Sequence, residues 1–318
     1  MTTRNVWPGM TMCQPRFRYS SVEHRHFGQT DMKVSVLGFG GSEIGSASSE
    51  LVDRLLKSAL DAGINVIDTA ECYEQSEELI GKAARKRRHE VFLFTKCGHP
   101  RGIGSQDWSR ESILDSVQRS LKRLQTDHLD LIQLHGASDT VMKDGDAIAA
   151  LETAREKGLA RYLGYSGDSH SARYAVECGA FDALQTSISL ADQEAITSTL
   201  PLAREKNMGV IAKRPLANVA WKTAHRPIKS YHHQYWDRLR KLHYDFIDDC
   251  TIEESVAKAL RFTLSVPGVH TAIVGTTKPE RWQQNAKMIA QGPLAEAEFE
   301  AIRERWDDVA PKSWIGQP

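Results

Sequence analysis

Four side chains that could transfer protons stand at or just after the ends of short apolar runs. Asp68 ends the run Ile64-Asn65-Val66-Ile67-Asp68, and Tyr73 follows five residues later. Lys96 ends the run from Val91, and His135 ends the run from Leu129. In a barrel of parallel strands the C-terminal strand ends meet at one mouth, where polar residues are typically catalytic. An acid, a phenol, an amine and an imidazole at one mouth indicate proton transfer to or from a carbonyl oxygen.

Tyr73 is the predicted proton donor of this set. A free tyrosine has a pKa near ~10, too high for efficient acid–base chemistry at neutral pH. We expect the Lys96 ammonium to lower the pKa of Tyr73, Asp68 to hold Lys96 in place, and His135 to orient the carbonyl or share the proton relay. Taken singly, Asp68 could be a turn cap and Tyr73 an aromatic side chain at the rim. Lys96 could be a solvated strand end, and His135 a core histidine. Their joint placement at strand ends favours the catalytic interpretation.

Eight apolar runs alternate with amphipathic segments along the chain. This order predicts a parallel sheet with right-handed crossovers, and eight units fit a closed (β/α)8 TIM barrel better than the alternative, an open sheet. The predicted strands are Val34–Leu37, Ile64–Asp68, Val91–Lys96, Leu129–His135, Ala160–Ser166, Ala183–Ser187, Val210–Lys213 and Thr271–Gly275. The predicted helices are Ser49–Ala62, Ser76–Arg88, Ser109–Leu124, Asp146–Lys157, Ser169–Cys178, Ile196–Lys206, Thr251–Ser265 and Pro279–Ala290.

Three segments lie outside these eight units. Residues 1–32 form a predicted N-terminal extension, in which His26–Met32 is interpreted as a hairpin closing the bottom of the barrel. Residues 33–318 form a single barrel domain, with a long insertion at 217–250 after the seventh strand. A loop of that length is usually a lid, a binding loop or locally ordered structure. Pro293–Asp308 predicts a terminal helix packed on the outside.

Charge and cysteine usage exclude several classes of protein. The 41 basic and 41 acidic residues cancel, so the composition indicates neither a nucleic-acid partner nor a membrane surface. No apolar run approaches the roughly 18 residues of a membrane span, and the N-terminus lacks a signal core. The five cysteines are scattered without a CxxC pair, and His232-His233 are adjacent, so we expect neither disulfides nor a metal site. A cytoplasmic protein is expected; the oligomeric state stays open.

These motifs resemble the aldo-keto reductase superfamily from about Phe27 to Asn285. The matching pieces are Val34-Ser35-Val36-Leu37-Gly38-Phe39-Gly40-Gly41, Asp68-Thr69-Ala70-Glu71-Cys72-Tyr73 with Ser76-Glu77-Glu78-Leu79-Ile80-Gly81, Leu129–His135 and Gly275-Thr276-Thr277. The resemblance implies a (β/α)8 barrel that reduces aldehydes or ketones with a nicotinamide cofactor. It places the family's catalytic residues at Asp68, Tyr73, Lys96 and His135, with Tyr73 protonating the carbonyl oxygen.

The resemblance also assigns cofactor-binding residues. It implies that the nicotinamide end meets Gly41, Ser42, Asp68, Ser166, Gln185, Lys213, Arg214 and Leu216, and the adenosine end Gly275, Thr276, Thr277, Lys278, Arg281, Gln284 and Asn285. Arg281 matches a position that often pairs with a 2′-phosphate, so NADP(H) is favoured and NAD(H) stays possible. For Gly38–Gly41, which lacks the GxGxxG spacing, the alternative to cofactor binding is a tight turn. For Lys278 and Arg281, the alternative is a helix start that is exposed to solvent.

Several positions depart from the family pattern. Gly167 stands where many members have Asn, Lys213 where an aromatic often stacks, and Gly275 where Lys is common. Gly136 replaces a common Trp, which either enlarges the pocket or leaves room for another side chain, such as Trp108 or one from 217–250. Cys72 is either an oxidation-sensitive residue of the catalytic turn or, as the favoured interpretation, a reduced core residue.

The sequence thus predicts an NADP(H)-dependent reductase of a small-molecule carbonyl compound. A nucleotide-binding, redox-sensing protein with little turnover is the main alternative. An unrelated (β/α)8 lyase or isomerase that forms an imine on Lys96 is another. Neither the substrate nor the physiological direction follows from the sequence.

Overall fold

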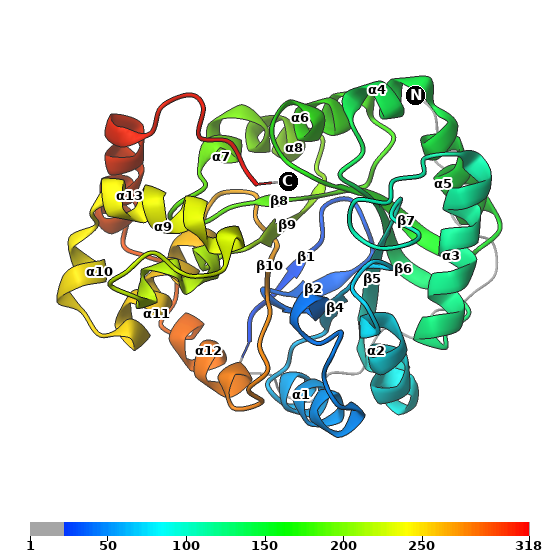
Figure 1. The fold of residues 1–318 in the computed structure, drawn as a ribbon, viewed down its shortest axis with the longest axis horizontal. Helices are drawn as coiled ribbons and strands as arrows, with labels where there is room; N and C mark the ends of the chain where they lie inside the picture. The colour runs from blue at the N-terminus through cyan, green and yellow to red at the C-terminus, as the bar shows by residue number, and fades with distance from the viewer. Residues whose placement is uncertain (1–21, 318) are drawn as a thin grey trace.

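A computed structural model describes residues 22–317 of the chain. Eight parallel strands close into a barrel in the order β10-β3-β4-β5-β6-β7-β8-β9, with helices around it (Figure 1). The barrel strands are β3 (Leu37–Gly40), β4 (Val66–Asp68), β5 (Phe92–Cys97), β6 (Leu129–His135), β7 (Ala160–Ser166), β8 (Ala183–Ser187), β9 (Gly209–Lys213) and β10 (Thr271–Val274). The predicted (β/α)8 barrel is confirmed, and the open sheet is excluded.

Helices follow the strands around the outside of the barrel. They are α1 (Ser49–Asp61), α2 (Ser76–Ala84), α3 (Arg110–Leu124), α4 (Asp139–Asp144), α5 (Asp146–Glu156), α6 (Ser169–Cys178), α7 (Glu194–Ser198), α8 (Leu200–Glu205), α11 (Ile252–Ser265), α12 (Arg281–Ile289) and α13 (Glu296–Val309). The segment predicted as one helix over Ile196–Lys206 is instead two, because Pro201 lies in the first turn of α8 and cannot continue the preceding helix through Thr199. The terminal helix is confirmed as α13.

An antiparallel hairpin precedes the barrel. β1 (His24–His26) pairs with β2 (Lys33–Ser35), so the predicted hairpin is present. The predicted range, His26–Met32, covers mainly the turn of this hairpin, and the two strands extend beyond it. The predicted first strand, Val34–Leu37, is wrong, because the chain bends at Val36 and the barrel strand begins at Leu37. Ser35 is fixed on the hairpin side by its backbone N–H, which donates to Asn65 Oδ1 at 2.7 Å. The run Val34-Ser35-Val36-Leu37 contains no Gly or Pro that would reveal such a bend.

The hairpin turn fills the bottom of the barrel. Phe27 and Met32 are fully buried there, in a cluster with apolar side chains from five strands: Val66, Phe92, Phe94, Leu131, Ala183 and Ile211. Phe27 lies 5.6 Å from Phe94, measured between ring centroids. The apolar plug leaves only the upper half of the barrel interior for polar side chains.

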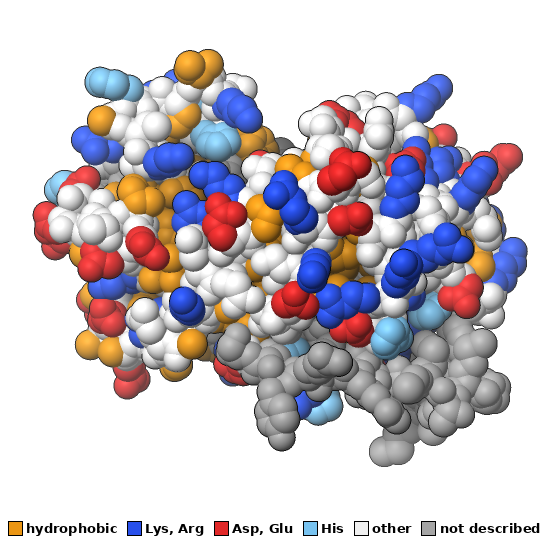
Figure 2. All heavy atoms as spheres, turned by 90° about the horizontal axis from the view of Figure 1, so that it is seen from below, with side chains coloured by type: hydrophobic (Ala, Val, Ile, Leu, Met, Phe, Trp, Pro, Cys, Tyr) orange, Lys and Arg blue, Asp and Glu red, His pale blue; other side chains and the backbone are white. Residues whose placement is uncertain are grey.

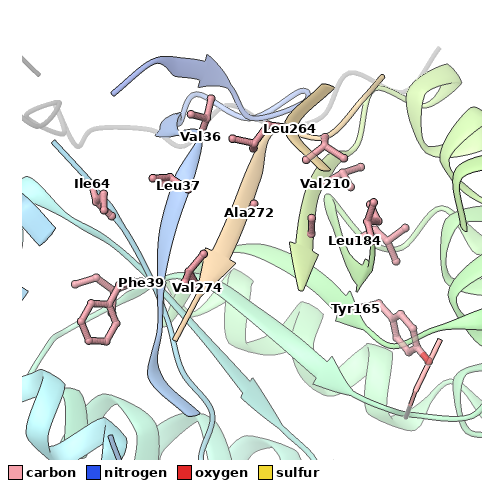
Figure 3. Packing of buried hydrophobic residues seen from close by; sticks show 14 of the residues in the cluster. Val36, Leu37, Phe39, Ile64, Tyr165, Leu184, Val210, Leu264, Ala272 and Val274 are labelled. Atoms are coloured by element: carbon pink, nitrogen blue, oxygen red, sulfur yellow. The ribbon is translucent and has the colours of Figure 1, made fainter. Parts of the chain in front are cut away.

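The larger core lies between the barrel and its helices. Leu37 and Phe39 of β3 lie beside Ala272 and Val274 of β10, in the register of the paired strands (Figure 3). Phe39 also stacks on Trp282 of α12, with ring centroids 5.2 Å apart. Since successive side chains of a strand point to opposite faces, the same strands supply both this outer core and the polar interior.

The insertion after β9 is helical. It contains η3 (Ala217–Lys222), η4 (Ser230–His232), α9 (His233–Leu242) and α10 (Asp245–Asp249). The inner face of α9 is buried and carries Tyr235, Leu239 and Leu242. Of the alternatives for the predicted insertion at 217–250, the structure therefore shows locally ordered structure.

Lys, Arg, Asp and Glu side chains are interspersed on the face drawn in Figure 2.

Across residues 22–317, no helix combines the length and apolar character needed to cross a membrane.

Replacement of Gly28 tests how closely the hairpin turn packs under the barrel. Gly28 has a φ of +57°, and an added Cβ would lie 2.3 Å from Gly209 N. We expect Gly28→Ala to lower the free energy of unfolding by about 3 kcal/mol or more, since left-handed backbone costs roughly 1–2 kcal/mol and the clash adds to it. Gly179→Ala is the control: its φ is +74° but the space around it is open. Equal losses in chemical denaturation would contradict the close packing.

Candidate active site

The structure brings the four predicted catalytic side chains together at the C-terminal end of the barrel. The Lys96 ammonium donates to Asp68 Oδ1 and, at 2.9 Å, to the carbonyl oxygen of Thr69. Lys96 Nζ also lies 5.0 Å from the ring centroid of Tyr73. The Tyr73 and His135 rings meet edge to face at 5.9 Å. The cluster therefore joins an acid, an ammonium, a phenol and an imidazole from three strands and one loop.

Strand pairing continues into the loop that carries Tyr73. The backbone N–H of Thr69 donates to Phe94 O at 2.9 Å, and that of Glu71 donates to Lys96 O at 3.2 Å. The chain then turns through Glu74, whose φ is +48°, and enters α2 at Ser76. These bonds hold Tyr73 above the end of β5 rather than leaving it on a free loop.

The pKa shifts follow from burial and from the neighbouring charges. Burial lowers the pKa of Lys96, but Asp68 and Tyr73 outweigh it, and the net pKa is raised, so the amine stays charged. Burial raises the pKa of Tyr73, and the Lys96 ammonium only partly opposes this shift. The expectation that Lys96 produces a net lowering of the Tyr73 pKa is therefore wrong. Burial is the largest cause that holds the pKa of His135 well below its usual range, and the positive charges of Lys96 and Lys213 lower this pKa further.

The second oxygen of Asp68 links the catalytic cluster to two predicted cofactor residues. Asp68 Oδ2 accepts from Gln185 Nε2 at 2.8 Å, and Ser166 Oγ donates to Gln185 Oε1 at 3.1 Å. Gln133 Nε2 also donates to Asp68 Oδ2, at 3.2 Å. The sequence interpretation missed Gln133, although it stands two residues before His135 on one strand and so points to the same face.

Lys213 and Arg214 enter a second polar cluster around Asp168. Lys213 Nζ lies 2.8 Å from Asp168 Oδ2, and Ser187 donates its backbone N–H to Asp168 Oδ1 at 2.7 Å. Burial acts to raise the pKa of Asp168, but Lys213 and these hydrogen bonds bring it below its ordinary value. Leu216 packs, partly buried, against the outer core. Asp168 was missed because its partner Lys213 is 45 residues away in the chain.

Tyr165 explains the glycine at position 167. An added Cβ on Gly167 would lie 2.4 Å from the Tyr165 hydroxyl, which donates to Ala137 O at 2.8 Å. The position that is Asn in many members therefore cannot hold a larger side chain here unless Tyr165 moves.

The C-terminal tail crosses toward the barrel mouth (Figure 1). Arg214 Nη1 donates to Gln317 O at 2.6 Å, and Arg238 Nη2 donates to Ile315 O at 2.7 Å. A cleft of about 440 Å³ lies between this tail and α9, at the rim rather than over the catalytic cluster. The sequence carried no signal for these contacts.

The residues predicted for the adenosine end lie at the end of β10 and at the start of α12. Lys278 and Arg281 are exposed, and Arg281 Nη1 donates to Gln284 Oε1 at 3.0 Å. An added Cβ on Gly275 would lie 2.9 Å from Glu43 Cγ, so this set adjoins η1 (Gly41–Glu43), where Gly41 is buried and Ser42 exposed. Within residues 22–317, no hydrogen bond joins the residues predicted for the adenosine end to the four predicted catalytic side chains. The residues predicted for the adenosine end are Gly275, Thr276, Thr277, Lys278, Arg281, Gln284 and Asn285.

The loop after β5 contributes His99, which the sequence interpretation also missed. His99 Nε2 donates to His135 O at 2.7 Å, and the two rings lie 5.2 Å apart. Glu71 Oε1 accepts the backbone N–H groups of Gly98 and His99, each at 2.9 Å, while Arg119 donates to Glu71 Oε2 at 2.7 Å. Glu71 therefore ties the Tyr73 loop to the His99 loop.

Space remains open beside His135. Trp108 packs on Gly98 and meets the His99 ring at 5.9 Å. An added Cβ on Gly136 would meet no described atom within 4 Å. Gly136 is itself exposed, so an enlarged pocket at this position stays a prediction.

Comparison with known proteins agrees with this geometry. The model of the "Aldo/keto reductase family" matches residues 36–307. The chain belongs to the aldo/keto reductase family. It is 29% identical over 299 residues to "Uncharacterized oxidoreductase YqkF" from Bacillus subtilis, covering 89% of this chain and 96% of that protein.

Two further relatives align with this chain over almost their whole length. The structure of "aldo-keto reductase AKR11C1 from Bacillus halodurans (holo form)" has a TM-score of 0.78 and 27% identity, and the alignment covers 92% of this chain and 99% of that one. A "Probable voltage-gated potassium channel subunit beta" from Arabidopsis thaliana is 27% identical, with coverage of 86% and 93%.

Replacement of Glu71 tests its bridging role in this aldo/keto reductase. Glu71→Ala leaves two backbone N–H groups without their acceptor and removes the ion pair with Arg119, and we expect it to lower the free energy of unfolding by about 3 kcal/mol. Glu298→Ala, which removes a partly exposed ion pair with Lys258, is the control, with an expected loss of about 1 kcal/mol or less. Denaturation curves that shift equally for both variants would contradict the bridge.

Proposed function

We propose that this protein reduces an aldehyde or ketone to an alcohol, with NADPH as the hydride source and Tyr73 as the proton donor. The observation that carries the proposal is the buried Lys96–Asp68 pair directly beneath the Tyr73 ring. A charged ammonium at that place stabilises the phenolate that proton donation leaves behind. It also disfavours the imine-forming interpretation of Lys96, since imine formation needs a neutral, accessible amine.

The residues of the mouth fit a nicotinamide nucleotide. Ser166 and Gln185 present a hydroxyl and an amide beside Asp68, which suits the carboxamide of a nicotinamide ring. Lys278 and Arg281 lie exposed at the start of α12, where a guanidinium fork suits a phosphate. Arg281 is the basis for NADPH over NADH. When bound, the nucleotide supplies a hydride to the carbonyl carbon.

The side chains of this chain supply the proton and the orientation. Tyr73, still protonated at neutral pH, gives its phenolic proton to the carbonyl oxygen, and the Lys96 ammonium stabilises the phenolate until solvent returns a proton. His135 is neutral and donates a hydrogen bond that orients the carbonyl oxygen. The hydride and the proton together convert the carbonyl group to the alcohol. We place the protein in the cytoplasm, acting on a small molecule.

Turnover with a panel of carbonyl compounds tests the proposal. NADPH and NADH consumption is measured over aldehydes, ketones and quinones. We expect turnover that Tyr73→Phe reduces by roughly 10²–10⁴-fold while NADPH binding persists, because only the transferable proton is lost. Tyr174→Phe is a matched control, since Lys143 lies 5.1 Å from its ring on the protein surface. It should leave turnover unchanged.

Tight NADPH binding without turnover of any carbonyl would overturn the reductase proposal. It would favour the alternative of a nucleotide-binding, redox-sensing protein with little turnover.

The pH dependence tests the state of Tyr73. Because the Tyr73 pKa is raised above its ordinary value near 10, the phenol stays protonated through the neutral and mildly alkaline range. We expect the rate of carbonyl reduction, as limited by Tyr73, to hold from about pH 7 to about pH 9 and to fall only at higher pH. Alcohol oxidation needs the phenolate, so its rate should rise with pH over the same range. A reductive rate that falls with an apparent pKa near about 8 would contradict this assignment.

A further inference from the structure

The thiol of Cys72 contacts the imidazole of His135. Cys72 lies directly before Tyr73, and its Sγ is 3.6 Å from His135 Nδ1. The side chain is almost fully buried, and burial raises the pKa of the Cys72 thiol to about 11 in spite of the nearby Lys96. The thiol therefore carries its hydrogen at neutral pH and can donate it to nitrogen.

The hydrogen-bonding capacities of the two groups favour one tautomer of His135. A neutral imidazole carries one hydrogen, on either Nδ1 or Nε2, and the other nitrogen is a strong acceptor. A thiol is a weak donor and its sulfur a weak acceptor, so the stronger pairing has the S–H group donating to the Nδ1 lone pair. Within residues 22–317, Nε2 makes no hydrogen bond, and His135 is partly exposed at the mouth.

We propose that Cys72 is a positioning residue that fixes His135 in the tautomer with its hydrogen on Nε2. That nitrogen then presents a donor to the substrate's carbonyl oxygen, beside the phenol of Tyr73. The role in catalysis rests on the proposed carbonyl reduction, whereas the tautomer itself does not.

The surroundings hold the imidazole ring in the orientation that this contact requires. His99 meets the ring at 5.2 Å and donates to the backbone carbonyl of His135, and Tyr73 meets it from another side at 5.9 Å. These neighbours fix the plane of the ring, and a 180° flip within that plane would put Cδ2 in place of Nδ1 and lose the contact with Cys72. The contact thus selects between two hydrogen positions on a ring that is already oriented.

Cys97 provides a matched comparison. It is a second buried thiol, directly after Lys96, but its Sγ donates to Gln133 O at 3.5 Å and its side chain packs in the outer core, as expected from strand alternation. Replacing it removes a buried thiol near the site without touching the imidazole.

Nitrogen-15 NMR of histidine-labelled protein reads the tautomer directly. In the wild type at neutral pH, His135 should show the chemical shifts of a protonated Nε2 and an unprotonated Nδ1. In C72A the Nδ1–H form should gain about fivefold relative to Nε2–H, the size expected for one lost hydrogen bond, and C97A should match the wild type. A wild-type spectrum with the hydrogen on Nδ1 would overturn the proposal, whether or not C72A folds. So would a C72A spectrum identical to that of the wild type.

Turnover provides the second readout. C72A should lower kcat by less than about fivefold, in proportion to the Nε2–H fraction that the NMR spectrum shows to be lost, with little change in KM, because a wrong tautomer removes a donor that acts on the bound carbonyl. C72S keeps a donor and should restore both the Nε2–H tautomer and kcat. A Cys72-dependent tautomer in a protein that reduces no carbonyl compound would support this inference and refute only the proposed function.

Discussion

The buried ion pair between Lys96 and Asp68 is the constraint on which the mouth of the barrel depends. Both side chains are at most 2% exposed. Removing one partner of such a pair typically costs about 3–5 kcal/mol, because the other charge stays buried. Both members of the pair are hydrogen-bonded to further groups: Thr69 supplies a carbonyl oxygen to the ammonium, and two glutamine amides donate to the carboxylate. A charged amine is thereby kept under a phenol, at a place where desolvation acts to lower the pKa of that amine.

The rest of the barrel interior makes this polar layer possible. The hairpin turn fills the bottom with Phe27 and Met32, so water does not reach the ion pair from below. Above it, Glu71 joins the loops after β4 and β5 through two backbone N–H groups. The four predicted catalytic side chains therefore lie on three strand ends and one loop that are fixed from both sides, which is the arrangement that keeps a site in one geometry.

Segments far apart in sequence form the rim. Arg214 joins the end of β9 to the C-terminal tail, and the four residues Arg214, Ala217, Asn218 and Val219 all have positive φ angles between 43° and 55°. Such backbone costs on the order of 1–3 kcal/mol for each non-glycine residue and persists where surrounding structure enforces it, often at functional sites. The segment includes Arg214, which the sequence predicts to bind the cofactor.

Local pattern was enough to identify the barrel and its four central residues. Seven predicted strands lie within two residues of the observed ones, because each is a short apolar run, and Asp68, Lys96 and His135 are polar residues at the ends of such runs. Tertiary contacts decided what local pattern does not contain. The bend at Val36 interrupts an apolar run, and the Arg214–Gln317 bond joins residues 103 positions apart. The sequence identified Lys96 as the neighbour of Tyr73, but only the depth of burial set the direction of the tyrosine's pKa, since desolvation there exceeds the attraction of the ammonium.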